Sequence, residues 1–264
     1  MKIVVIGGTG LIGSKLMRKL TEHGHEAVAA SPRTGVNTVT GQGLAAVLKG
    51  AQVIVDVSQS PVLPGFYLNV RQPPSPEERA VMEFFVTSTS NLLQYGVAAG
   101  VGHITVLSVV GTQRLSESPY FRAKIAQEKL IKESPIPYSI VQATQFFEFV
   151  KSIADFSTLG NQVHLAPVLI QPMVADEVAE TLCRISVGTP VNGIVEVAGP
   201  EKFRLDELIR RYLGAVGDSR EVVFDPDALY SGARLSERTL VPEDDAKLGE
   251  IRFEDWLAQE SVKK

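Results

Sequence analysis

The chain has 264 residues, of which 44% are hydrophobic and 21% are charged, with a formal net charge of −4 and one cysteine, Cys183. This balance permits a large core and excludes the basic footprint of a nucleic-acid-binding protein. A single cysteine excludes a disulfide framework, and no apolar run in the sequence is long enough to cross a bilayer. Because the chain starts on an apparent strand without a leader pattern, we expect a cytoplasmic protein.

The first sixteen residues, MKIVVIGGTGLIGSKL, have the order strand, glycine turn, helix. Lys2–Ile6 is a run of β-formers, and a helix is expected from about Gly10 to His23. In a dinucleotide-binding turn, one glycine allows the tight turn, one leaves room for the pyrophosphate, and one lets helix and strand pack closely. An ordinary βα turn is the alternative. We predict the cofactor-binding residues Gly7, Thr9, Gly10, Leu11, Ile12 and Gly13.

The residues that follow the second expected strand, Glu26–Ala30, distinguish NAD from NADP as the cofactor. An acidic residue after it would bind the ribose hydroxyls of NAD and repel a 2′-phosphate, but none is present. Ser31 and Arg33 instead offer a hydroxyl and a guanidinium, which suit a phosphate. Although Arg33 could be a solvated loop charge, we predict NADP(H) as the cofactor.

The next stretch predicts a short strand at Val36–Val39, a helix over Gly41–Lys49 and a buried strand over Gln52–Val57. Val57 and Ser58 end that last strand, at the sheet edge where ligands bind in open α/β sheets, so we assign them to the cofactor site.

The stretch Ser60–Pro76 contains five prolines and the group Phe66-Tyr67-Leu68. It is too long for a simple connection, and such loops are typically lids, binding loops or mobile segments. We predict that it contacts the substrate pocket or a second subunit, with a passive surface insertion as the alternative.

The rest of the chain continues the alternation of strands and helices. The expected elements are a helix over Glu77–Ala99, strands at His103–Leu107 and Pro137–Gln142, a helix that Ser118 caps and Pro119 begins, and Val174–Val187 (helix), Gly193–Ala198 (strand) and Leu205–Ala215 (helix). Asp176 is expected to cap its helix. We therefore predict a doubly wound α/β fold, with a dinucleotide-binding core over residues 1–144 and a sheet edge plus a small substrate lobe over residues 145–264.

Tyr120 and Lys124 stand four residues apart on a helix, so their side chains point the same way. Ser108 lies twelve residues earlier, at the carboxyl end of a strand. An ammonium group beside a phenol lowers the phenol's pKa, which lets it transfer protons near neutrality. A nearby hydroxyl can bond the oxygen on which charge develops. We predict Ser108, Tyr120 and Lys124 as the catalytic residues.

The glycine spacing GxxGxxG, followed by this Ser, Tyr and Lys, resembles the short-chain dehydrogenase/reductase superfamily. The segments GGTGLIG, LKGAQVIVDV, TSTSNLL, LSVVGT, YFRAKIAQE, VQATQFFEF and VAGPEKFRLDEL resemble its NmrA-like atypical members over nearly the whole chain. The resemblance implies a Rossmann core, Lys124 on the nicotinamide ribose, and pocket residues Gln145, Phe146 and Phe147. Plain packing is the alternative for Phe147, and the proline-rich stretch is longer than usual for this group.

These features favour an NADPH-dependent reductase of a small carbonyl or conjugated substrate. The alternative is a non-catalytic dinucleotide-sensing protein that acts on a partner, because the resembled family also contains sensors, which usually lack the tyrosine. An isomerase or epimerase that uses a bound cofactor is a third possibility. His23 and His25 lack matching ligands, so we predict no metal site. Homo-oligomerisation is left open.

Overall fold

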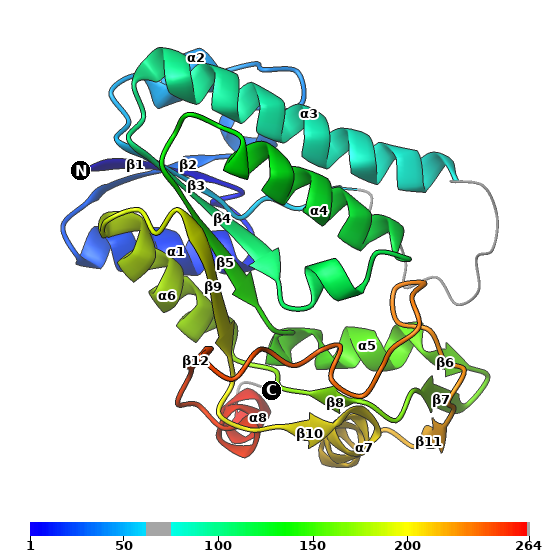
Figure 1. Ribbon diagram of the computed structural model, residues 1–264. Helices are drawn as coiled ribbons and strands as arrows, with labels where there is room; N and C mark the ends of the chain where they lie inside the picture. Colours follow the sequence, from blue (N-terminus) through cyan, green and yellow to red (C-terminus); the bar gives the residue numbers. More distant parts are fainter. Residues whose placement is uncertain (62–74, 263–264) are drawn as a thin grey trace.

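The computed structural model describes residues 1–61 and 75–262 and has a seven-stranded parallel sheet at its centre (Figure 1). The strand order is β12-β9-β5-β4-β3-β1-β2. The strands are β1 (Lys2–Ile6), β2 (Glu26–Ala30), β3 (Val53–Asp56), β4 (His103–Val109), β5 (Tyr138–Ala143), β9 (Gly193–Ala198) and β12 (Lys247–Leu248). The chain leaves β1 to one side for β2 and to the other for β3, so the order reverses at β1. The expected Rossmann-type α/β fold is confirmed.

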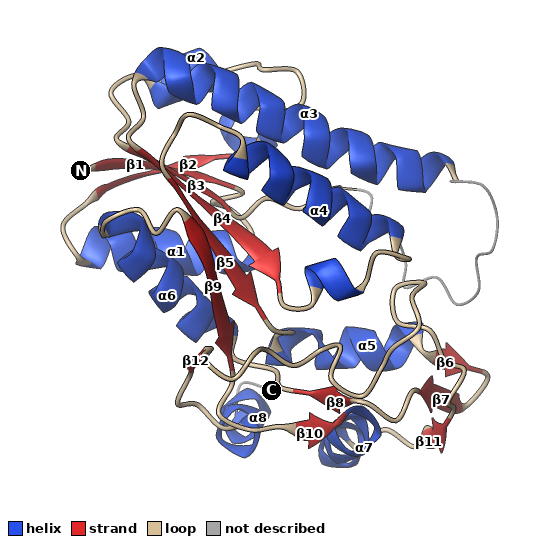
Figure 2. Cartoon of the chain, viewed as in Figure 1, coloured by secondary structure: helices blue, strands red, loops and turns tan. Residues whose placement is uncertain are grey.

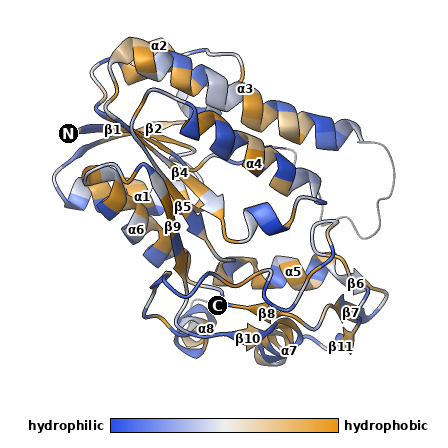
Figure 3. Cartoon of the chain, in the orientation of Figure 1, coloured by the Kyte–Doolittle hydropathy of each residue, from blue (hydrophilic) through white to orange (hydrophobic). Residues whose placement is uncertain are grey.

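Helices cover both faces of this sheet (Figure 2). One face carries α1 (Leu11–Glu22) and α6 (Ala175–Val187), and the other carries α2 (Leu44–Leu48), α3 (Pro76–Ala99) and α4 (Pro119–Lys132). The central strands are rich in apolar residues (Figure 3), because strands that are covered on both sides need apolar residues on both faces.

The remaining elements gather below the carboxyl ends of the strands (Figure 1). They are α5 (Val150–Phe156), β6 (Thr158–Leu159), β7 (Gln162–Leu165), β8 (Leu169–Ile170), β10 (Phe203–Arg204), α7 (Leu205–Val216), β11 (Glu221–Phe224) and α8 (Phe253–Val262). A separate apolar cluster around Phe147, Phe253 and Leu208 holds them together. We call this part the lobe.

The expected strand at Val36–Val39 is wrong. The Asn37 Oδ1 atom accepts hydrogen bonds from the backbone N–H groups of Val39 (2.9 Å) and Thr40 (3.1 Å), which folds the segment into a turn. Asn91 on α3 donates to the carbonyls of Thr38 and Val39, so two carbonyls that a strand would use are already bonded. The expected helix at Gly41–Lys49 is also shorter and begins at Leu44, since Gly43 has φ +77°.

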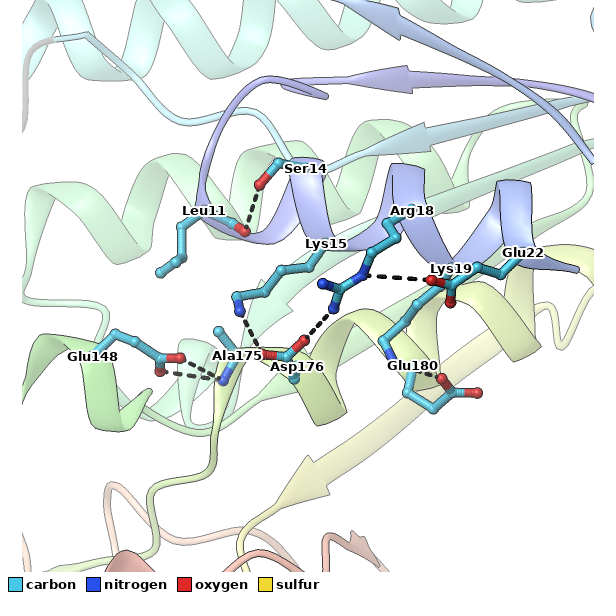
Figure 4. Close-up of polar contacts among 10 residues, drawn as sticks. All are labelled: Leu11, Ser14, Lys15, Arg18, Lys19, Glu22, Glu148, Ala175, Asp176 and Glu180. Atoms are coloured by element: carbon cyan, nitrogen blue, oxygen red, sulfur yellow. Dashed lines mark hydrogen bonds and ion pairs between the residues drawn. The ribbon is translucent and has the colours of Figure 1, made fainter. Parts of the chain in front are cut away.

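The expected cap at Asp176 is wrong as well. The helix α6 begins after Val174, and its first N–H, at Ala175, donates to both carboxylate oxygens of Glu148 at 3.1 and 3.2 Å (Figure 4). Asp176 instead bonds Lys15 and, at 3.1 Å, Arg18 on α1, so it joins the two helices of this face. Ser118 does precede α4, but its side chain makes no capping bond.

Most of the stretch Ser60–Pro76 lies outside the described residues, so its predicted contact with substrate or subunit stays a prediction.

Candidate dinucleotide and proton-transfer site

The glycine turn between β1 and α1 is closed by contacts that leave no room for side chains. Gly7 has φ +78°, which favours glycine, and a Cβ there would lie 2.9 Å from the Ser58 backbone. A Cβ on Gly13 would lie 2.1 Å from the Gly7 carbonyl oxygen, so the third glycine lets α1 press against the turn. Gly8, which the spacing argument omits, is equally constrained, since its Cβ would lie 2.9 Å from Ala29.

The start of α1 is open to an anion. Its N-cap residue is Gly10, no side chain caps it, and its first turn contains no acidic residue. Thr9 and Gly10 are exposed, Leu11 is 39% exposed, and Ile12 is buried beneath them. Free N–H groups at a helix start bind phosphate through hydrogen bonds and through the helix dipole.

Two buried serine hydroxyls flank this turn, one at the end of β2 and one just after β3. Ser31 forms a capping box with Thr34, and the Ser58 side chain lies close enough to the Asp56 carboxyl to oppose the rise in that group's pKa. Arg33 is exposed on the short 3₁₀ turn Pro32–Thr34, and Val57 is half-buried beside Ser58. These groups, with the uncapped helix start, fit the ribose and phosphate portions of a dinucleotide.

Lys124 is buried on α4 and its ammonium is bonded to the protein. It donates to the Leu107 carbonyl oxygen at 2.9 Å and to Gln127 Oε1, and it lies 4.7 Å from the centre of the Phe85 ring. Burial lowers the pKa of Lys124 to about 8, although the nearby carboxylates of Asp56 and Glu128 raise it. None of these contacts joins the Lys124 ammonium to the Tyr120 phenol.

Ser108 is bonded to a carboxylate. Its hydroxyl donates to Glu128 Oε1 at 2.6 Å, and Gln142 Nε2 donates to the same oxygen at 2.7 Å. Glu128 is fully buried, and its second oxygen faces Lys132 Nζ at 3.5 Å. The Ser108 proton is therefore used inside the protein, and only the lone pairs of its oxygen remain for another donor.

The Tyr120 phenol in the first turn of α4 has a different surrounding. Its hydroxyl is 3.4 Å from Gln59 Oε1, and its ring packs edge-on against Phe85 and Phe121. Burial raises the pKa of Tyr120 to about 12, so the expected lowering by Lys124 is wrong. The physical reason is that the ammonium is directed at Leu107, Gln127 and Phe85 instead.

The three predicted pocket residues, which follow Thr144 after β5, have separate environments. Gln145 is buried near the sheet edge, Phe146 stacks on Phe149 with ring centres 5.5 Å apart, and Phe147 packs against Phe253 and Trp256 in the lobe. Phe147 is 1% exposed.

A buried polar network around Lys124 is not indicated by the sequence motifs. Asp56, at the end of β3, accepts a hydrogen bond from Gln127 Nε2 at 3.0 Å, and Gln127 in turn bonds Lys124. Burial raises the pKa of Asp56. The spacing of Glu128 could have indicated part of this network. Glu128 follows Lys124 by four residues and Tyr120 by eight, which places all three on one helix face.

The described residues contain no cluster of three potential metal ligands and no helix long and apolar enough to cross a membrane.

The solved structures most useful for comparison share the whole fold. MoeE5 in complex with UDP-glucuronic acid and NAD has a TM-score of 0.70 at 15% identity, covering 98% of this chain and 97% of that one. A dTDP-4-dehydrorhamnose reductase from Clostridium acetobutylicum has a TM-score of 0.69 at 13% identity, covering 100% and 99%. RMD from Pseudomonas aeruginosa, complexed with NADPH, has a TM-score of 0.66 at 16% identity, covering 97% and 95%. At these identities the likeness shows the Rossmann-type fold.

Sequence comparison adds a more specific match. Residues 3–63 match the model of the NAD dependent epimerase/dehydratase family, and this stretch contains the glycine turn, Ser31, Arg33 and Ser58. The photosystem II assembly factor Ycf39 of Cyanophora paradoxa is 25% identical over 162 residues, which are 56% of this chain and 46% of that protein. The chain thus aligns with about half the length of this relative. The amino-terminal part is therefore similar to that of the NAD dependent epimerase/dehydratase family, on a Rossmann-type fold.

Proposed function

We propose that the chain is an NADPH-dependent reductase of a small, neutral carbonyl or conjugated compound, of the NmrA-like type. The observation that carries this proposal is the position of the Tyr120 phenol, whose hydroxyl lies 3.4 Å from Gln59 Oε1 just after β3, at the same sheet edge as the uncapped start of α1. Ligands of open α/β sheets bind at this edge.

The cofactor's binding follows from the chain's own groups. The N–H groups at the start of α1 take the pyrophosphate, and Ser31 with Arg33 takes the 2′-phosphate. When bound, NADPH supplies the hydride that adds to the substrate's carbonyl carbon. The family matched by residues 3–63 and the NADPH in the RMD structure support a nicotinamide cofactor.

Tyr120 delivers the proton to the carbonyl oxygen, so that hydride and proton together convert a carbonyl into an alcohol. Burial raises the pKa of Tyr120 to about 12, so the phenol is protonated at neutral pH but is a weaker acid than a free phenol, and donation requires that the phenolate be stabilised as it forms. Lys124 supplies a buried positive charge one helical turn away, and Ser108 is held by Glu128 as an acceptor rather than a donor.

The Tyr120→Phe variant tests this role. We expect turnover to fall by about 10²–10⁴-fold while NADPH affinity is kept, because the ring packing survives and only the proton donor is lost. The assay is NADPH oxidation over a panel of carbonyl compounds and quinones. Tyr138→Phe, at the opposite end of the sheet, is the matched control. Full activity of Tyr120→Phe on an accepted substrate would refute the assignment.

The Arg33→Ala variant tests the cofactor. We expect the wild type to prefer NADPH over NADH, and we expect Arg33→Ala to lose affinity for NADPH alone, by roughly 1.5–3 kcal/mol for a charge-assisted contact. Titration of both cofactors into both proteins measures this. Equal wild-type affinities would contradict the proposal.

A non-catalytic NADP(H)-sensing protein is the second candidate. It is favoured because Lys124 and Ser108 both make hydrogen bonds inside the protein, to Leu107 and Glu128. Tyr120 contacts Gln59 instead, so the described hydrogen bonds do not connect the three predicted catalytic residues to one another. This candidate predicts tight NADPH binding with no NADPH oxidation over the panel, and equal cofactor binding by Tyr120→Phe and wild type.

A further inference from the structure

A chain of buried hydrogen bonds connects the glycine turn with the proposed proton-transfer site. The Asp56 carboxylate lies in the middle of this chain, at the end of β3, and is 2% exposed. Its Oδ1 atom accepts a hydrogen bond from the Ser58 backbone N–H at 2.9 Å, and its Oδ2 atom accepts one from Gln127 Nε2 at 3.0 Å. Because each oxygen serves a different segment, the carboxylate joins the loop after β3 to α4.

The Gln127 amide has one orientation that satisfies both of its neighbours. Its Oε1 atom accepts a hydrogen bond from the Lys124 ammonium, and its Nε2 atom donates to Asp56. With oxygen and nitrogen exchanged, an acceptor would face a carboxylate and a donor would face an ammonium. Gln127 is 1% exposed, so water has no access to replace either bond. The amide therefore bridges a buried negative charge and a buried positive charge.

The charges around Lys124 explain why this bridge matters. A buried ammonium is costly unless an opposite charge lies near it. Two carboxylates face Lys124, Asp56 from β3 and Glu128 from the same helix, and both raise its pKa against the effect of burial. The other elements packed on it contribute uncharged groups, the Phe85 ring from α3 and the Leu107 carbonyl oxygen from β4. Glu128 also accepts hydrogen bonds from side chains of β4 and β5, whereas Asp56 reaches the ammonium through the amide bridge.

The other end of the chain presses on the glycine turn. A Cβ on Gly7 would lie 2.9 Å from Ser58 Cα and 2.9 Å from the Val57 carbonyl oxygen, so the backbone after β3 is in close contact with the turn. The bond from the Ser58 N–H to Asp56 holds that backbone in place. The path from the turn to the ammonium has one contact per step and runs through Gly7, Ser58, Asp56, Gln127 and Lys124.

We propose that Asp56 and Gln127 are positioning residues that couple the glycine turn to the Lys124 ammonium. A phosphate group that binds at the turn displaces the backbone of Ser58, and the hydrogen-bonded chain transmits this displacement to the ammonium. The coupling is reciprocal, so the charge on Lys124 also affects the turn. This inference rests on the proposed function, because it takes the turn and Lys124 as parts of one site, and it adds two residues that act through Ser58 and Lys124.

NMR titration of the protein without cofactor, from about pH 7 to 9.5, tests the coupling. The Lys124 ¹³Cε signal, assigned by comparison with Lys124→Met, should titrate with a midpoint of about 8, and the backbone amide signals of Ser58 and Gly7 should shift with the same midpoint. The Tyr120 phenol, whose pKa burial raises to about 12, stays protonated over this range.

The Gln127→Met variant breaks the chain while it keeps the length of the side chain. The Lys124 midpoint should fall by about one unit, because a charge-assisted hydrogen bond is lost, and the titration of the Ser58 and Gly7 amides should disappear. Gln113→Met is the matched control, since Gln113 Nε2 reaches Glu128 at 3.4 Å and lies outside the chain, so the common midpoint should remain.

Two outcomes would refute the coupling. The Ser58 amide does not follow Lys124 in the wild type, or it titrates equally in Gln127→Met, as a charge acting through space would make it do. Asp56→Asn, which keeps the shape of the side chain, should abolish the shared titration as well and decides the question if Gln127→Met does not fold.

Titration with ADP separates this inference from the proposed function, because ADP carries a pyrophosphate but no nicotinamide that could touch Lys124. Bound ADP should change the Lys124 midpoint in the wild type and leave it unchanged in Gln127→Met. An equal change in both proteins, or none in either, would contradict the coupling. If neither ADP nor NADP⁺ binds, the cofactor assignment fails, and the cofactor-free titrations still decide whether the chain couples Ser58 to Lys124.

Discussion

Replacing Gly13 by alanine tests whether close packing of α1 against the glycine turn governs stability. Gly13 and Gly214 both lie in helices without positive φ, so alanine would favour either helix by about 1 kcal/mol if nothing else changed. The surroundings differ, because a Cβ on Gly214 has nothing within 4 Å, whereas a Cβ on Gly13 lies 2.1 Å from the Gly7 carbonyl oxygen and 2.7 Å from Gly8 Cα.

The magnitude follows from this geometry. A carbon–oxygen contact is comfortable at about 3.3 Å, so α1 must retreat by roughly 1.2 Å, and the obstacle is backbone that cannot rotate away. Overpacking of this kind costs about 3 kcal/mol. After the gain in helix propensity, Gly13→Ala should lower the free energy of unfolding by about 2 kcal/mol, and Gly214→Ala should raise it by about 0.5–1 kcal/mol.

Urea unfolding followed by circular dichroism measures both changes, and titration with NADPH measures the effect on the turn. Gly13→Ala should also bind NADPH more weakly, because the N–H groups at the start of α1 move with the helix. A Gly13→Ala protein as stable as wild type, with unchanged cofactor affinity, would refute the reasoning. A destabilised Gly214→Ala would show that the helix-propensity term is wrong.

Two further predictions concern charged groups. Burial lowers the pKa of Lys124 from 10.5 to about 8, so between these pH values the unfolded chain binds more protons than the folded one. The free energy of unfolding of the wild type should therefore rise from pH 8 to 10 relative to that of Lys124→Met. A difference between the two proteins that does not change with pH would refute this. Asp176→Asn removes the partner of Lys15 and Arg18 and should cost about 0.5–1 kcal/mol at low salt, with the loss shrinking in 1 M NaCl, whereas Glu22→Gln should cost less.

The strands of the sheet are largely predictable because a parallel sheet imposes a simple pattern. The bounds of β1, β2 and β9 are those expected, since short apolar runs between turn residues leave few alternatives. The expected strand at Val36–Val39 fails because two asparagine side chains, Asn37 and the distant Asn91, compete for its backbone. A contact across more than fifty residues leaves no trace in local periodicity.

The candidate site is predictable only where chemistry depends on local spacing. The turn glycines Gly7 and Gly13 follow from their spacing, and the structure shows the close approach of backbone that explains them. The directions of side chains do not follow from spacing. Lys124 and Ser108 lie where expected, but Gln127 and Glu128 bond them away from Tyr120, and these partners become visible only once α4 is packed on the sheet.

Two neighbouring helices on one face, α1 and α6, start toward the same edge of the sheet, yet only one is available to an outside anion (Figure 4). The Glu148 carboxylate occupies the start of α6, while α1 has no side-chain cap and no acidic residue in its first turn. The protein therefore fills one of two similar electrostatic positions with its own charge. A dinucleotide that binds at this edge as proposed can place its phosphates at the start of α1 but not at the start of α6, because the Glu148 carboxylate already occupies the start of α6.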